Sequence, residues 1–371
     1  MWIKLSSILK NFILLFFLIF VFNIFISLSL ASPNEAVLQA EIANRTAQNS
    51  HNKPFRKRRL LPFLQKNNKN YGPGDHTFFV GEKVSFRKIY VHVPSSYNPK
   101  IPMPLILNFH GGGGSPEGQK ETSQMDKTSD EKGFIVAYPQ GSGKNPRLKR
   151  RRFWNPGSGP DGMISEDPTL NSIDDYAFVN ESIDILEQNL NIDSRRIYAT
   201  GFSNGGILSH GLACRLSHRI AAIASVAGPY WTYEKNCKPK RPVSILHFHG
   251  TADRCAPYLG GPSQCHGKIS RSKPREFRSA KDSVKIWQNI NQCPSKAKII
   301  YQKGKAICFS YGPCNKDTEV ILCSIKDAGH TWPGGKAYGL PGMDVGETSK
   351  DINANEFMWN FFKKNPLPKN S

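Results

Sequence analysis

The sequence lacks several patterns that would indicate a multi-span membrane protein, a metalloprotein or a nucleic-acid-binding protein. After residue 30 no apolar run reaches the length that spans a bilayer. No two cysteines have the C-x-x-C spacing of a zinc ribbon or a thioredoxin motif. No aromatic RNA-binding pattern and no zinc-finger spacing is present, so nucleic acid is not an expected partner. Acidic residues are scarce, with 29 against 50 basic residues and a formal net charge of +21.

The N-terminal segment has the pattern of an export signal. Lys4 and Lys10 flank the start of an apolar run at 12–30, and Ser29-Leu30-Ala31 matches a small-x-small cleavage site. The run is long for a signal peptide, so residues 1–31 are either a cleaved signal or an uncleaved signal anchor. Both interpretations place the rest of the chain outside the cytoplasm. We therefore expect a protein that is secreted, extracellular or periplasmic.

Cysteine usage agrees with export. The eight cysteines, an even number, all follow the apolar run, and an oxidising compartment favours four disulfides over eight free thiols. They are Cys214, Cys237, Cys255, Cys265, Cys293, Cys308, Cys314 and Cys323. Eight cysteines allow about 105 pairings, so the sequence by itself leaves the connectivity open.

Positive charge is concentrated in two runs, at 53–59 and at 147–152. We interpret both as solvated segments, with weak contact to anionic surfaces as the alternative. The first run lies in residues 32–75, which are rich in Asn, Lys, Arg, Gln and Pro and indicate a flexible basic linker. The predicted organisation is a signal peptide or anchor at 1–31, this linker, and one folded domain at 76–371.

From residue 84 onward the apolar patterns predict alternating strands and helices. Strands are expected at 86–93, 105–109, 135–138, 197–200, 220–226 and 243–249, and helices at 176–190, 206–216, 280–291 and 352–362. Two further β-like segments, 297–311 and 319–325, are expected to pair as a hairpin around 313–317. Strands that alternate with helices predict an α/β fold with a mostly parallel central sheet and helices on both faces.

The strongest local motif is Gly201-Phe202-Ser203-Asn204-Gly205, between the strand expected at 197–200 and the helix expected at 206–216. In that setting G-x-S-x-G is typical of a nucleophile elbow, a tight turn that lifts the serine hydroxyl above the sheet. The helix N-terminus behind it directs backbone N–H groups toward developing negative charge. A glycine-rich turn without chemistry is the alternative that this context disfavours.

A serine nucleophile needs a base, and two residues after Ser203 follow expected strands in the order that this elbow requires. Asp253 comes after the strand at 243–249, and His330 comes after the segment at 319–325. We expect His330 to take the serine proton and to return it to the leaving alkoxide. Asp253 is expected to orient the imidazole and stabilise its charged form.

Two other histidines, His247 and His249, lie two residues apart in one expected strand. Their side chains would face the same side of that strand, a spacing that two metal ligands can have. No third ligand has a suitable place, so we interpret both as structural and expect no catalytic metal.

A glycine run, His110-Gly111-Gly112-Gly113-Gly114, follows the strand expected at 105–109. Glycine lets the backbone approach a substrate closely, and a loop of this type supplies one N–H to an oxyanion hole. We expect Gly112 to supply it and Asn204, directly after the serine, to supply the second. The run has neither a G-K-[S/T] end nor a G-x-G-x-x-G pattern, which argues against phosphate binding.

Together these motifs resemble the secreted esterases of the polyhydroxybutyrate depolymerase-like and feruloyl esterase-like group. The resemblance covers residues 84–362 and rests on Asn108-Phe-His-Gly-Gly, Tyr138-Pro-Gln-Gly, Ser172-Ile-Asp-Asp175, Gly201-Phe-Ser-Asn-Gly-Gly206, His249-Gly-Thr-Ala-Asp253 and Gly329-His-Thr-Trp-Pro-Gly334. It implies that 76–371 is an α/β-hydrolase catalytic domain that cleaves esters through an acyl-enzyme and needs no cofactor. It also implies that Ser203, Asp253 and His330 form the catalytic triad.

The resemblance has two further implications. It implies the disulfides Cys293–Cys314 and Cys214–Cys237, and we assign the four remaining cysteines as Cys255–Cys265 and Cys308–Cys323. Asp174 and Asp175 match a motif of the group that we interpret as a cap of the following helix rather than as catalytic residues.

The sequence therefore predicts an exported serine carboxylic ester hydrolase. Its expected substrates are small or oligomeric esters: hydroxyalkanoate oligomers, feruloyl esters, or acetyl esters on sugars. Trp154, in a loop rich in Gly, Pro and Arg, and Trp332, beside His330, are expected to contact an aromatic or sugar group, with core packing as the alternative. A lipase-like enzyme at anionic membranes and a catalytically inactive binding protein on the same fold are the alternative functions. The oligomeric state is left open.

Overall fold

A computed structural model of the chain describes residues 71–81, 87–142, 152–155, 173–230, 237–265, 276–337 and 344–369. The chain divides into two compact units, Met1–Asn67 and Asn68–Ser371, and all of the described residues belong to the second. The export signal, the first basic run and all but Arg152 of the second run lie outside the described residues. None of the helices in the described ranges is long and apolar enough to cross a membrane.

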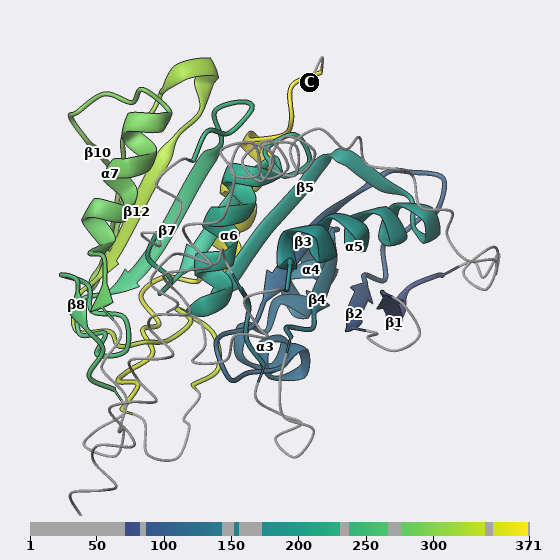
Figure 1. Cartoon of the computed structure of the whole chain (residues 1–371), viewed down its shortest axis with the longest axis horizontal. Helices are drawn as coiled ribbons and strands as arrows, with labels where there is room; N and C mark the ends of the chain where they lie inside the picture. The colour runs from purple at the N-terminus through teal and green to yellow at the C-terminus, as the bar shows by residue number, and fades with distance from the viewer. Residues whose placement is uncertain are drawn as a thin grey trace, which may run out of the picture. The chain divides into compact units, whose positions relative to one another are not determined.

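A ten-stranded sheet forms the centre of the second unit, in the order β1-β2-β4-β3-β5-β6-β7-β12-β11-β10 (Figure 1). The strands from β4 to β12 in this order are parallel, and antiparallel pairs flank them at both edges. The mostly parallel α/β sheet predicted from the sequence is thus confirmed. The bounds are Gly74–Val80 (β1), Arg87–Val93 (β2), Met103–Phe109 (β3), Ile135–Pro139 (β4), Ile192–Phe202 (β5), Ala222–Val226 (β6), Ser244–Gly250 (β7), Lys298–Lys303 (β10), Ala306–Ser310 (β11) and Val320–Ile325 (β12).

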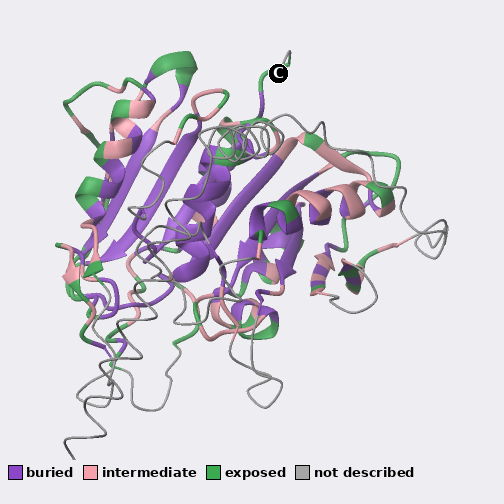
Figure 2. Cartoon of the chain, viewed as in Figure 1, coloured by how far each residue is buried: buried purple, intermediate pink, exposed green. Residues whose placement is uncertain are grey.

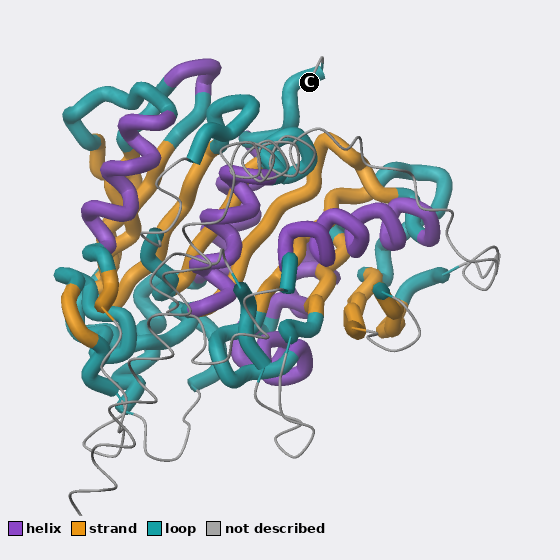
Figure 3. Tube along the Cα trace, in the orientation of Figure 1, coloured by secondary structure: helices purple, strands orange, loops and turns teal. Residues whose placement is uncertain are grey.

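Helices cover both faces of this sheet (Figure 3). Residues of α5, α6 and α7 belong to one hydrophobic core, whereas residues of α4 and α8 belong to the other. The helix bounds are Pro116–Ser123 (α3), Met125–Lys132 (α4), Asp175–Asn189 (α5), Asn204–Arg215 (α6), Ala280–Ile290 (α7) and Ala354–Lys364 (α8). A short pair, β8 (Gly261–Pro262) and β9 (Glu276–Phe277), and the 3-10 turn η4 (Asn315–Asp317) complete the described elements.

Alternation along the central strands explains why two cores flank one sheet. In β3, Leu105 and Leu107 belong to the core of α5, α6 and α7, whereas Ile106 between them belongs to the core of α8. Successive side chains of a strand point to opposite faces, so a continuous apolar run buries both faces. The central strands are accordingly buried along almost their whole length (Figure 2).

The C-terminal β-region differs from the sequence-based expectation. Residues 297–311, expected as one segment, form a hairpin of their own, in which β10 and β11 pair across a turn at Gly304. Gly304 has a φ of 51°, in the left-handed region that glycine adopts at little cost. The pairing expected around 313–317 is nevertheless present, since β11 pairs antiparallel with β12.

Two helices, α3 and α4, were not predicted because their residues are nearly all polar and show no apolar period. The available signal was a local one at the start of α3. Ser115 caps that helix by accepting a hydrogen bond from Gly118 N at 3.2 Å, and Pro116 follows in the first turn. Strand β1 was also not predicted, since polar residues fill its N-terminal half.

All eight cysteines are joined in four disulfides. The pairs are those assigned in the sequence analysis: Cys214–Cys237, Cys255–Cys265, Cys293–Cys314 and Cys308–Cys323. Cys308 and Cys323 are directly paired residues of β11 and β12. The antiparallel register therefore brings the two sulfur atoms together, and they form a disulfide.

Buried histidines make the free energy of unfolding depend on pH. His210 on α6 accepts a hydrogen bond from Trp287 Nε1 at 2.9 Å, and burial lowers its pKa to about 3. Because the folded state binds this proton less readily than the unfolded chain, stability falls as pH drops below about 6.5. Between pH 7 and pH 5 this one group is expected to cost about 2 kcal/mol.

The variant His210→Asn removes the titrating group and keeps an acceptor for the Trp287 N–H. Urea unfolding at both pH values should show a loss that is smaller than the wild-type loss by about 2 kcal/mol. Equal losses in the two proteins would contradict the assignment of this pH dependence to His210.

Candidate active site

Ser203 occupies the sharp turn between β5 and α6, with φ 53° and ψ −116°. A positive φ is uncommon for a residue other than glycine and is the strained geometry expected of a nucleophile elbow. Close backbone contacts explain the flanking glycines. A Cβ at Gly201 would lie 2.5 Å from the carbonyl carbon of Gly205, and a Cβ at Gly205 would lie 2.3 Å from Phe109 O. The elbow is therefore packed directly against the end of β3.

Asp253 and His330 meet at the same edge of the sheet. They follow β7 and β12, which are neighbouring parallel strands, so the carboxyl ends of the two strands lie side by side. His330 Nδ1 lies 2.7 Å from Asp253 Oδ2, and both side chains are buried. Burial by itself would raise the pKa of Asp253, but the charge of His330 and hydrogen bonds from His249 and His330 lower it well below its usual range. Asp253 is thus a carboxylate that can orient the imidazole.

Close backbone packing holds the two loops that carry this pair. A Cβ at Gly250 would lie 2.2 Å from Ala328 O, and a Cβ at Gly329 would lie 2.0 Å from Val345 O. Ala252 N also donates to Ala328 O at 2.9 Å. Only glycine permits these approaches, so the glycines before Asp253 and His330 fix the two side chains relative to each other.

Ser203 and His330, the predicted nucleophile and base, lie close together in the structure. The ring of His330 lies 4.8 Å from the ring of Phe202, the residue before Ser203. Among the hydrogen bonds of the described residues none joins Ser203 Oγ to His330, whose Nδ1 bonds to Asp253. Such contacts are often long in unliganded hydrolases and shorten when substrate binds. The three predicted residues are therefore brought to one site.

The glycine run after β3 lies against the elbow. A Cβ at Gly111 would lie 3.5 Å from Ser203 Cβ, and a Cβ at Gly112 would lie 3.6 Å from Asn204 Cβ. Gly113 N donates to Arg152 O at 2.7 Å, and Gly114 N donates to Gly111 O at 3.0 Å. Within the described residues the backbone N–H of Gly112 has no such partner. Asn204 N–H, in the first turn of α6, has no intrahelical acceptor. These two groups are thus available to a substrate oxygen.

The expectation that Trp154 and Trp332 contact the substrate is wrong, because both side chains are completely buried. Trp154 Nε1 donates to His110 O at 2.9 Å, and Trp332 Nε1 donates to Asn355 Oδ1 at 3.0 Å. The alternative of core packing holds for both. A buried indole N–H needs an acceptor. The hydrogen bond of Trp154 therefore holds its segment against the start of the glycine run, and that of Trp332 holds the loop after His330 against α8.

Phe153 is the aromatic residue at this site that the sequence analysis missed. It is only partly buried, and a Cβ at Gly112 would lie 3.2 Å from its ring. The sequence signal that could have identified Phe153 was the alternation of side-chain direction along an extended segment. Phe153 and Trp154 are adjacent in an extended segment bridged to Ser142, so their side chains point in opposite directions. Burial of one exposes the other beside the glycine run.

Asn204, Asp175 and Arg87 anchor this segment. The Asn204 side chain accepts from Trp154 N at 2.7 Å and donates to Trp154 O at 3.2 Å. Asp175 accepts from Asn155 N and pairs with Arg87 at 2.6 Å. Only Asp174 acts as the predicted helix cap, accepting from Ala177 N at 2.9 Å. Asp175 is instead a buried structural carboxylate.

Two groups among the described residues bring three metal-ligand types together. In the first, Asp253, Cys255 and His330, the sulfur of Cys255 is bonded to Cys265 and the other two bond to each other. In the second, Asp75, His92 and Asp126, the ammonium of Lys120 lies 2.6 Å from Asp75 and 2.7 Å from Asp126. Neither group presents a free ligand set for a cation.

The phospholipase/carboxylesterase family matches residues 96–287, about half of the chain, including the elbow and Asp253. The chain belongs to the phospholipase/carboxylesterase family. This assignment agrees with the elbow, the glycine loop and the acid residue described above, and it confirms the predicted α/β-hydrolase fold.

Two curated relatives resemble the chain over about two thirds of its length. Feruloyl esterase B of Piromyces equi is 33% identical over 253 residues, which are 67% of this chain and 44% of the relative. The bifunctional acetylxylan esterase/xylanase of Neocallimastix patriciarum is 27% identical over 255 residues, which are 67% of this chain and 32% of the relative. The chain thus spans less than half the length of either protein.

Among solved structures, the acetyl xylan esterase from Aspergillus awamori has a TM-score of 0.50 and 14% identity, covering 78% of this chain and 99% of that chain. Such a likeness shows the fold alone. The feruloyl esterase half of the resemblance seen in the sequence is confirmed by the relatives, and the polyhydroxybutyrate depolymerase half stays a prediction.

Proposed function

We propose that the protein is a serine carboxylic ester hydrolase that acts through an acyl-enzyme on feruloyl or acetyl esters. The observation that carries the proposal is the buried pair of His330 and Asp253, with a 2.7 Å contact between Nδ1 and Oδ2, beside the strained elbow of Ser203. A serine, a histidine and a carboxylate in this arrangement recur on several folds and perform acyl transfer.

In the proposed reaction His330 takes the proton of Ser203 while Oγ attacks the ester carbonyl carbon. The resulting tetrahedral oxyanion accepts hydrogen bonds from Gly112 N and Asn204 N. Collapse of this intermediate expels the alcohol, which receives the proton from His330, and leaves an ester on Ser203. Water, deprotonated by His330, then attacks that ester, and the acid is released as Ser203 regains its proton.

The names of the relatives favour feruloyl and acetyl esters as substrates over hydroxyalkanoate oligomers. Phe153 supports the same preference, since its partly buried ring lies beside Gly112, the proposed oxyanion donor. An aromatic acyl group or a sugar can pack on such a ring. Export is part of the proposal and is supported by the four disulfides, which persist in oxidising compartments.

The proposal is tested by labelling the full chain with a fluorophosphonate probe and locating the adduct by peptide mass spectrometry. We expect one adduct, on Ser203, and hydrolysis of p-nitrophenyl acetate and methyl ferulate in preference to p-nitrophenyl palmitate. A preference for palmitate would favour the lipase-like alternative. No adduct and no hydrolysis in a folded protein would favour the inactive binding protein.

Phe153→Ala is expected to separate aromatic from small substrates. Loss of the ring should raise KM for methyl ferulate about tenfold, since one aromatic contact is worth about 1 kcal/mol or slightly more. The kcat for p-nitrophenyl acetate should change less than about threefold, because the Phe153 side chain is not a member of the proposed triad and the small acetyl group does not need the ring for packing. Steady-state measurement of kcat and KM for both esters, in the wild type and the variant, tests this prediction. An equal rise in KM for both esters would remove Phe153 from acyl selection.

A further inference from the structure

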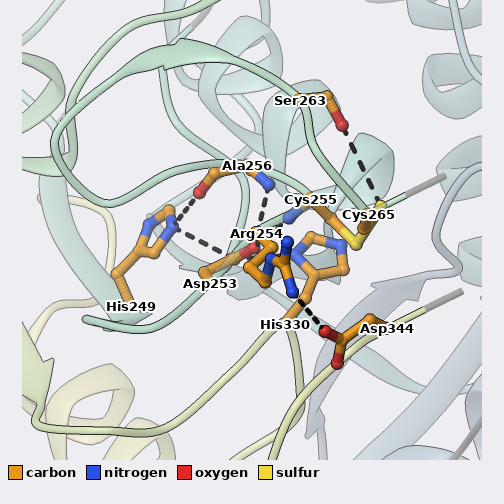
Figure 4. Close-up of a disulfide and its surroundings, with 9 residues drawn as sticks. All are labelled: His249, Asp253, Arg254, Cys255, Ala256, Ser263, Cys265, His330 and Asp344. Carbon is orange, nitrogen blue, oxygen red and sulfur yellow. Dashed lines mark hydrogen bonds and ion pairs between the residues drawn. A yellow bond between two sulfur atoms is a disulfide. The ribbon is translucent and has the colours of Figure 1, made fainter. Parts of the chain in front are cut away.

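Each carboxylate oxygen of Asp253 has two polar neighbours. Oδ1 accepts from the backbone N–H groups of Cys255 and Ala256, both at 2.8 Å. Oδ2 faces His330 Nδ1 at 2.7 Å and His249 Nε2 at 3.2 Å. Figure 4 shows the two imidazoles on opposite sides of Asp253. His249 therefore shares with the proposed base the one oxygen that orients that base.

Hydrogen bonding fixes the tautomer of His249. Its Nε2 lies 2.7 Å from Ala256 O, which only accepts, so Nε2 carries a proton and also points toward Asp253 (Figure 4). Its Nδ1 lies 2.9 Å from His247 Nε2. A neutral His249 protonated at Nε2 has a lone pair on Nδ1, so His247 Nε2 is the donor of that bond. The remaining His247 Nδ1 is then a lone pair, which matches its lack of a partner among the described residues.

We propose that His249 is a positioning residue for catalysis, acting through Asp253, and this inference rests on the proposed triad. The Nε2–H of His249, which bonds to Ala256 O at 2.7 Å, also lies 3.2 Å from Oδ2 and restrains the oxygen that His330 Nδ1 contacts at 2.7 Å. Its bond to Ala256 O also ties β7 to the loop whose N–H groups hold Oδ1. His247 supports this arrangement by keeping the proton of His249 on Nε2 rather than on Nδ1.

Burial makes the arrangement specific. His247, His249 and Asp253 are all buried, so loss of the donor beside Oδ2 leaves a buried carboxylate with one polar neighbour fewer. A carboxylate that loses one donor in such a place moves toward its remaining partners. Here that movement would change the angle at which His330 presents Nε2 to Ser203. A small misplacement of a catalytic group is enough to lower kcat strongly.

Two substitutions at His249 separate positioning from plain structural support. His249→Gln keeps an N–H donor close to the place of Nε2, whereas His249→Asn keeps an acceptor close to the place of Nδ1 and loses the donor to Asp253. Both remove a buried ring, so both lose some stability. We expect His249→Asn to lower kcat for p-nitrophenyl acetate about 10- to 100-fold with KM within about twofold. His249→Gln should retain kcat within about threefold of the wild type.

Ser182→Ala serves as the control, since it removes another buried polar group, on α5, whose hydroxyl donates to Phe178 O at 2.7 Å, and it should leave kcat unchanged. Thermal unfolding verifies that each variant is folded at the assay temperature. Equal kcat values for His249→Asn and His249→Gln would overturn the proposal. If Ser203 is still labelled by the fluorophosphonate in that case, the esterase function stands and only the role of His249 fails. An unlabelled, inactive wild type would overturn both.

Discussion

Replacing Ser203 with alanine is expected to lower kcat for p-nitrophenyl acetate by about 10⁵- to 10⁶-fold. The hydroxyl is the proposed nucleophile, and without it His330 and Asp253 have no covalent step to assist. A residual rate over the uncatalysed reaction should persist, because the proposed oxyanion donors, the N–H groups of Gly112 and Asn204, are unchanged in this variant. Steady-state rates of p-nitrophenyl acetate hydrolysis, measured for the freshly purified wild type and variant, give the loss in kcat.

The fold should tolerate this change. Ser203 Oγ makes no hydrogen bond to His330 in the structure, and alanine differs from serine only by that oxygen. We expect the melting temperature to move by less than about 2 °C. Ser209→Ala is the control, because Ser209 lies on the same helix α6 and only donates to Gly205 O at 3.0 Å. If Ser203→Ala keeps more than about a tenth of wild-type kcat, the triad as proposed is wrong.

Gly205→Ala is expected to have the second-largest effect, through the backbone rather than through chemistry. Its Cβ would lie 2.3 Å from Phe109 O and 2.7 Å from His110 O. Both neighbours are main-chain atoms, at the end of β3 and at the start of the glycine run, so they cannot move aside as a flexible side chain can. The elbow must separate from the glycine run, at a cost of about 3 kcal/mol in the free energy of unfolding. A shift of the oxyanion donors by about 1 Å should lower kcat about 100-fold or more.

Gly118→Ala is the matched control for this substitution. Gly118 lies in α3, and a Cβ there would meet only Ser115 Oγ, at 3.6 Å. Alanine at a helical position of this kind stabilises by up to about 1 kcal/mol. Urea unfolding and hydrolysis of p-nitrophenyl acetate are measured for both variants. A Gly205→Ala protein with wild-type stability and kcat would show that the elbow does not need the close contact with β3.

The sequence carried much of the site because its signals are local. The elbow, Gly201 to Gly205, needs only a strand before it and a helix after it, and both are visible as apolar periods. Asp253 and His330 were found because each follows a strand, and parallel strands bring such ends to one edge of a sheet. Strand β1, the hairpin of β10 and β11 and the polar helices α3 and α4 lacked such signals.

Local pattern determined that the chain is an α/β protein and which residues stand at the carboxyl edge of its sheet. Tertiary structure decided which of them face the substrate and which face the core. Trp154 packs into the core, so Phe153 on the opposite side of the extended segment stays partly exposed. This orientation depends on residues distant in sequence, because Asn204 and Asp175 accept hydrogen bonds from the backbone of Trp154 and Asn155. The contact between His249 and Asp253 likewise depends on tertiary structure. Strand periodicity gives the side of the sheet, whereas the contact requires that the loop after β7 fold back over it.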